Sequence, residues 1–101
     1  MSTHATKHDT AKPRFSLLPH GPLAEVVKVY EFGAGKYGTY NWQAGLPYTR
    51  WYDAVMRHLF AWFRGERHDP ESGLHHLAHA TFGLLALMWQ EDNNKGEDDR
   101  R

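Results

Sequence analysis

The sequence predicts an all-α protein, a compact helical bundle of about three main helices with one ordered aromatic loop. Three segments carry apolar residues at helical spacing, and glycine and proline gather between these segments. The chain has 101 residues, which fits one domain built around one core. A domain of this size gains stability by burying an apolar helix face against a second copy, so we also expect a homo-oligomer.

Pro22 is expected in the first turn of the first helix, where proline is tolerated. Apolar residues then recur at helical spacing: Leu23, Val26, Val27 and Tyr30. We expect Gly33 and Gly35 to stop this helix rather than to form a dinucleotide-binding fingerprint. Residues 36–48 contain glycine, asparagine and proline among aromatic residues, so this segment is predicted to be the ordered loop.

Thr49 is expected to cap the second helix, which ends near Gly65. Its apolar stripe consists of Trp51, Val55, Leu59, Trp62 and Phe63. Residues 66–73 are predicted to form a turn, because they include aspartate, proline, serine and glycine. The third helix is expected over 74–89, with helical spacing of Leu77, Ala80, Leu84, Leu87 and Met88. Its low polarity predicts burial by both the second helix and a partner subunit.

The two ends differ from the middle in composition. Residues 1–11 are polar without apolar periodicity, and residues 91–101 are charged. We therefore expect a flexible arm over 1–11, a single helical domain over 12–90 that holds the binding site, and a charged disordered tail over 91–101.

Composition excludes several classes of protein. The absence of cysteine excludes disulfides and thiolate zinc sites and suits a reducing cytoplasm. No apolar run approaches the roughly 20 residues that span a bilayer, and no signal peptide is recognised, so we expect a cytoplasmic protein without a membrane partner. Twelve basic residues balance twelve acidic ones, so duplex nucleic acid is not the expected partner. The motifs of P-loop proteins and serine hydrolases are missing.

Basic and aromatic residues form the first candidate site, because guanidinium groups bind phosphate oxygens and aromatic rings stack on bases. The predicted ligand-binding residues are Lys12, Arg14, Lys36, Tyr37, Asn41, Trp42, Tyr48, Arg50 and Arg57. The partner indicated is a small-molecule nucleotide. In the structural alternative, Arg57 pairs with Asp53 one turn away, the aromatic residues belong to the core, and the basic residues before Phe15 are a solvated arm.

Histidines form the second candidate site. His76 and His79 are three residues apart on the third helix, and His58 lies on the second helix. With Asp69 they could bind a divalent transition metal (Mn, Zn, Ni or Fe), while Glu66 or Glu71 would act as the catalytic acid or base. In the alternative, the histidines are hydrogen-bonded core residues and the acidic residues favour the N-terminus of the third helix.

Several ordered motifs resemble those of a family of phage proteins, the dATP/dGTP diphosphohydrolase N-terminal domain. The motifs are Lys12-Pro13-Arg14-Phe15, Gly33-Ala34-Gly35-Lys36-Tyr37-Gly38, Asn41-Trp42, Arg57-His58-Leu59, Ala61-Trp62, Gly65-Glu66, Asp69-Pro70-Glu71-Ser72-Gly73 and His76-Leu77-Ala78-His79-Ala80. The resemblance covers nearly everything from Lys12 to Trp89. It implies a helical fold related to the all-α NTP pyrophosphatases, a phage setting and a purine nucleotide ligand.

The resemblance does not carry over the magnesium site of those pyrophosphatases. Their carboxylates lie in E-x-x-E and E-x-x-D motifs on two helices, because hard cations prefer oxygen ligands. The corresponding helices here carry His58 and the His76/His79 pair, and Glu66-x-x-Asp69 falls in the turn without a preceding E-x-x-E.

Three hypotheses about function follow. The first is a purine nucleotide-binding protein of phage type, which sequesters a nucleotide signal of host defence in the host cell cytoplasm. The second is a metal-dependent dATP/dGTP diphosphohydrolase, in which the histidines and Asp69 hold the metal. The third is a structural subunit of a larger assembly, which predicts that charge reversal at Arg14 and Lys36 changes only solubility.

Overall fold

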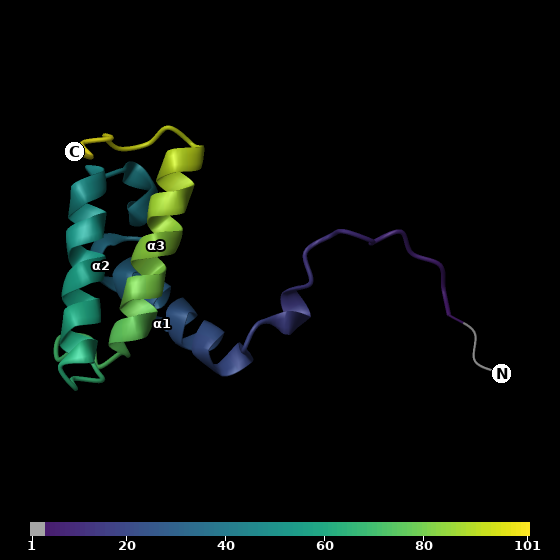
Figure 1. The fold of residues 1–101 in the computed structure, drawn as a ribbon, viewed down its shortest axis with the longest axis horizontal. Helices are drawn as coiled ribbons and strands as arrows, with labels where there is room; N and C mark the ends of the chain where they lie inside the picture. Colours follow the sequence, from purple (N-terminus) through teal and green to yellow (C-terminus); the bar gives the residue numbers. More distant parts are fainter. Residues whose placement is uncertain (1–3) are drawn as a thin grey trace.

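The computed structural model describes residues 4–101, which contain three α-helices, two short 3-10 helices and no strands. The elements are η1 (Phe15–Leu17), α1 (His20–Tyr37), η2 (Asn41–Ala44), α2 (Tyr48–Phe63) and α3 (His76–Asp92). The α-helices form one bundle in which α2 and α3 lie side by side, and α3 also packs against α1 (Figure 1). The expected all-α class of three main helices is confirmed.

The first helix is longer than expected at its C-terminal end. The prediction that Gly33 and Gly35 stop it is wrong, because α1 continues to Tyr37 and ends at Gly38, whose φ is 100°. An interior glycine costs a helix about 1 kcal/mol relative to alanine, which tertiary packing readily offsets. A positive φ, in contrast, takes the backbone out of the helical region, and glycine adopts it without strain.

The start of the second helix also differs from expectation. The prediction of a Thr49 cap is wrong, because Pro47 occupies the N-cap position and Tyr48 is the first helical residue. The backbone N–H and hydroxyl of Thr49 both donate to the carboxylate of Asp99, at 3.0 and 2.6 Å. The residue that satisfies this helix end therefore comes from the C-terminal segment and could not be found by local sequence patterns.

The α2 and α3 helices approach closely at one small residue. A Cβ atom added at Gly83 of α3 would lie 2.6 Å from Cγ2 of Val55 on α2, far inside van der Waals contact. The other side of α3 meets α1, where Val26, Val29 and Ala78 form the centre of an apolar cluster. The α3 helix is thus the element that both other helices pack against.

Gln90 on α3 connects three parts of the chain. Its side chain is fully buried at 0% exposure. Its Oε1 accepts hydrogen bonds from the Leu46 N–H at 2.8 Å and from the Trp51 indole N–H at 2.6 Å. Its Nε2 donates to the Leu46 carbonyl at 2.9 Å. The amide therefore joins α3 to the start of α2 and to the segment before it.

The two ends of the described chain behave differently. The segment before α1 extends away from the bundle (Figure 1), and Lys12 and Arg14 on it are exposed. The C-terminal segment instead folds back along the start of α2, where the N–H of Tyr48 donates to the Glu97 carbonyl at 2.9 Å. The acidic residues Glu91 and Asp92 complete α3 rather than belonging to a separate tail.

Large apolar side chains remain on the outer faces of α2 and α3. Each of the following is more than half exposed: Tyr52, Phe60, Phe63, Leu84 and Met88. The expected homo-oligomer stays a prediction. Within residues 4–101, no helix is both long and apolar enough to cross a bilayer.

Replacing Gln90 with alanine should lower the free energy of unfolding by about 2–6 kcal/mol. The change leaves the buried Trp51 indole N–H and the part-buried Leu46 N–H without partners, at about 1–3 kcal/mol each. Urea unfolding followed by tryptophan fluorescence measures the effect. Glu91→Ala, on the exposed position next to it, should change stability by less than about 1 kcal/mol, and an equally small effect at Gln90 would contradict this role.

Candidate functional site

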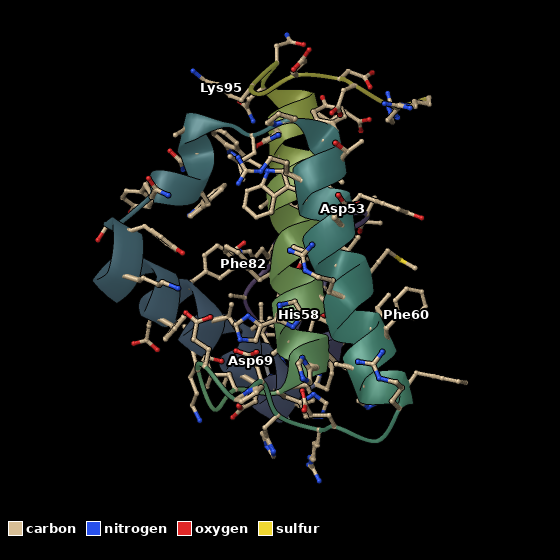
Figure 2. All side chains as sticks on the ribbon, turned by 90° about the vertical axis from the view of Figure 1, so that its left-hand side faces the viewer. Asp53, His58, Phe60, Asp69, Phe82 and Lys95 are labelled. Atoms are coloured by element: carbon tan, nitrogen blue, oxygen red, sulfur yellow. The ribbon has the colours of Figure 1, made fainter. Side chains whose placement is uncertain are left out.

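A pocket of about 910 Å³ opens between α1 and α2. Figure 2 shows its surroundings, with Phe82 and His58 between the two helices and Asp69 close to His58. The walls come from α1, η2 and α2, and α3 contributes His79 and Phe82. Ligand pockets commonly measure about 300–1,000 Å³, so this one has room for a molecule the size of a nucleotide.

Three of the predicted basic residues line the pocket, namely Lys36, Arg50 and Arg57. Lys36 forms an ion pair with Glu71, which also lines the pocket. Arg50 and Arg57 are exposed and form no ion pair within residues 4–101, so the expected alternative of an Arg57 pair with a neighbouring aspartate is not formed. Both guanidinium groups are available to an anionic ligand.

The aromatic wall has one anchored ring and two exposed ones. The Trp42 ring meets the edges of Tyr30 and Trp89, with ring centroids 5.7 and 5.1 Å away, so core contacts hold it in place. Tyr37 is 61% exposed and Tyr40 is 66% exposed. All three line the pocket together with Asn41.

Three predicted ligand-binding residues lie elsewhere. Lys12 and Arg14 belong to the segment that extends away from the bundle, and Tyr48 packs beneath the guanidinium group of Arg100, 5.5 Å from its ring centroid. None of them lines the pocket. Of the predicted ligand-binding residues, the pocket therefore gathers Lys36, Tyr37, Asn41, Trp42, Arg50 and Arg57, but not Lys12, Arg14 or Tyr48.

The turn between α2 and α3 is held by backbone hydrogen bonds. The Asp69 N–H donates to the Leu74 carbonyl at 2.8 Å, and the Gly73 N–H donates to the Asp69 carbonyl at 2.7 Å. The His76 N–H donates to the Arg67 carbonyl at 2.9 Å. These bonds fix the carboxylate of Asp69 beside the start of α3.

Ser72 orients this carboxylate and was not predicted as a site residue. Its N–H and its hydroxyl both lie 3.1 Å from Oδ2 of Asp69. The hydroxyl oxygen also lies 2.6 Å from Nε2 of His79. The signal in the sequence is an aspartate followed three residues later by serine, a pattern typical of side-chain-stabilised turns.

Two histidines from different helices meet behind the pocket. Nδ1 of His58 on α2 lies 2.8 Å from Nδ1 of His76 on α3, and Nε2 of His76 lies 2.7 Å from a carboxylate oxygen of Glu66. His79 stacks on His58, with ring centroids 4.5 Å apart and planes 7° from parallel. The three predicted histidines thus lie together, with His58 in contact with both of the others. Glu66 contacts His76 and does not line the pocket.

Three of these side chains could hold a metal ion. His58, Asp69 and His76 each offer one ligand atom, and these atoms all lie within 4.8 Å of one another. Among residues 4–101 no other group of this kind occurs. His79, the fourth predicted ligand, lies outside this group because its Nε2 faces Ser72 and stands 3.8 Å from Asp69.

Burial keeps His58 and His79 neutral. It lowers the pKa of His58 to about 4, with further lowering by the neighbouring His79 and His76. Burial also lowers the pKa of His79. For Asp69, burial raises the pKa, but the hydrogen bonds from Ser72 outweigh it and the net pKa is lowered. Neutral imidazoles and an ionised carboxylate are the forms that bind metal ions or accept protons.

Comparison with known proteins confirms the resemblance seen in the motifs. The family model described as dATP/dGTP diphosphohydrolase, N-terminal, matches residues 2–100. A curated protein of Salmonella phage PMBT28, named dATP/dGTP diphosphohydrolase, is 43% identical over 95 residues, which cover 94% of this chain and 32% of that protein. The chain thus spans about a third of the length of this relative. No solved structure gives a significant match.

Acidification should destabilise the metal-free protein between pH 6.5 and about 4. The unfolded chain takes up a proton at His58 below about pH 6.5, whereas the folded chain does so only near its lowered pKa of about 4. The free energy of unfolding in EDTA, measured by urea at several pH values, should therefore fall across this window. His58→Gln should make the fall shallower, and the exposed His20→Gln should not; equal slopes in the two variants would refute the assignment.

Proposed function

The chain belongs to the dATP/dGTP diphosphohydrolase N-terminal family, and from that premise we propose that it binds a purine nucleotide in the pocket between α1 and α2. The observation that carries the proposal is the composition of this one pocket. It combines two guanidinium groups without ion pairs, an anchored indole ring and exposed tyrosines. Phosphate groups and a base are the parts of a nucleotide that such side chains bind.

The phosphates are assigned to the α2 side of the pocket. Arg50 and Arg57 lie seven residues apart on α2, which is two helical turns, so both guanidinium groups can face one ligand. Lys36 approaches from α1 and is paired with Glu71, so a phosphate would compete with this carboxylate for the ammonium group. The base is assigned to the wall formed by Tyr37 and Trp42.

Binding without turnover fits the sequestering role that we propose for a phage protein. A tight complex that leaves the nucleotide intact removes a signal of host defence from solution, and this needs recognition but no reaction. The phage origin of the relative and the pocket itself support this role. Mass spectrometry of small molecules released by heating the purified protein tests it, because an intact nucleotide is expected.

Charge removal on α2 should weaken nucleotide binding. Arg50→Gln and Arg57→Gln should each raise the dissociation constant for dATP or dGTP about tenfold or more, because a hydrogen bond to a charged group contributes about 1.5–3 kcal/mol. Calorimetric titration of the EDTA-treated chain measures this. Arg64→Gln removes the same charge at the end of α2, outside the pocket, and should change affinity little.

Removing an exposed ring should weaken binding of the base. Tyr37→Ala should raise the dissociation constant about 5- to 100-fold, because stacking contributes about 1–3 kcal/mol per base. Tyr52→Ala is the matched control, since Tyr52 is similarly exposed on α2 but does not line the pocket. If no purine nucleotide binds the wild-type chain, the proposal is wrong.

The second candidate function is hydrolysis, favoured by the histidine and carboxylate cluster that adjoins the pocket. Water would attack the α-phosphorus of dATP or dGTP, the bond to the bridging oxygen would break, and a nucleoside monophosphate and pyrophosphate would leave. Glu71 lines the pocket and is placed to accept the proton of that water, whereas Glu66 lies against His76. Pyrophosphate release in the presence of manganese or zinc, lost in Glu71→Gln with affinity retained, would support this function.

A further inference from the structure

The contact between His58 and His76 brings two ring nitrogens together. Nε2 of His76 lies 2.7 Å from a carboxylate oxygen of Glu66, so in the tautomer that donates to Glu66 the other nitrogen, Nδ1, has a free lone pair. That Nδ1 lies 2.8 Å from Nδ1 of His58. In the tautomer of His58 that is protonated on Nε2, both Nδ1 lone pairs are free to bind one cation.

A carboxylate oxygen lies beside these nitrogens. Ser72 bonds to Oδ2 of Asp69, and Oδ1 has no hydrogen-bond partner within residues 4–101. The ligand atoms of the three residues all lie within 4.8 Å of one another, and ligands of one metal ion are separated by about 3–4 Å when the bonds are near 2.1 Å long. To hold one ion, the two Nδ1 atoms, now 2.8 Å apart, would have to separate by several tenths of an ångström.

We propose that His58, His76 and Asp69 bind one divalent transition-metal ion, and that Glu66 is the carboxylate that fixes the ring of His76 for this purpose. His76 is 3% exposed, so its position is set by packing. A ligating histidine commonly donates its other N–H to a carboxylate, which fixes the tautomer and raises the basicity of the ligand. Glu66 stands in that relation to His76.

The ligand set determines the class of metal. Two imidazole nitrogens and one carboxylate oxygen suit zinc, manganese, iron, cobalt or nickel, whereas magnesium and calcium prefer oxygen ligands alone. Three protein ligands leave further coordination positions for water or a ligand oxygen, as in catalytic rather than structural sites.

The ion would lie at one end of the pocket. His58 and Asp69 line the pocket, whereas His76 stands behind them, so the remaining coordination positions face the space proposed for the nucleotide. His79 and Ser72 adjoin this side, with 2.6 Å between Nε2 and the hydroxyl oxygen. A role of the ion toward phosphate rests on the proposed function, but binding of the ion itself does not.

Metal titration of the full chain tests the proposal. The protein is purified without a histidine tag, treated with EDTA, and titrated separately with Zn²⁺, Co²⁺, Mn²⁺ and Mg²⁺. We expect one Zn²⁺ or Co²⁺ per chain by elemental mass spectrometry, visible absorption bands from bound Co²⁺, and far weaker binding of Mg²⁺. His58→Gln and Asp69→Asn should each raise the dissociation constant for Zn²⁺ by more than about 100-fold, and Glu66→Gln by about 10- to 100-fold.

His20→Gln is the matched control, because it removes an exposed histidine at the start of α1, far from the group along the chain. Circular dichroism shows whether each variant is folded, and His58→Gln and Asp69→Asn leave the buried His76 itself in place. Absence of stoichiometric metal, equal loss in the control, or preference for Mg²⁺ would each overturn the proposal. Nucleotide titration of the EDTA-treated chain tests the proposed function separately, so the two can fail independently.

Discussion

One buried amide holds together segments that are far apart in the sequence. Gln90 accepts from the indole of Trp51 and bonds to both backbone groups of Leu46, and a Cβ on Gly96 would collide with its amide group. The amide thereby sets the register between α2 and α3. Further along the helix pair, Val55 of α2 meets Gly83 of α3, and His58 meets His76 beyond it. The histidine site depends on a contact at the opposite end of the helix pair.

Sequence patterns predicted the features that depend on the spacing of apolar residues and on local turn residues. Three helices follow from the spacing of apolar residues, and the turn before His76 follows from its aspartate, proline, serine and glycine. The histidine site was expected from the three-residue spacing of His76 and His79 on the third helix and from His58 on the second. In the structure, ligand atoms of His58, Asp69 and His76 lie within 4.8 Å of one another.

What sequence patterns missed depends on contacts between distant segments. Nothing local indicates that Asp99 bonds to the start of α2, that the helix runs through Gly33 to Gly38, or that Gln90 is buried. Sequence patterns also did not indicate which basic residues line the pocket. Lys12 is near proline and aromatic residues in the sequence, but it lies on a segment outside the bundle. Tertiary packing decides which charges share a pocket, and spacing along the chain does not.

The side chains proposed to bind a metal and the aromatic side chains of the pocket come from different helices. The α2 and α3 helices with their turn supply all three atoms proposed for the metal, while α1 and η2 supply the facing aromatic wall. Because the atoms proposed for the metal all come from the hairpin of α2 and α3, substitutions on the pocket-facing side of α1 can change the size and polarity of the pocket without removing any of these atoms.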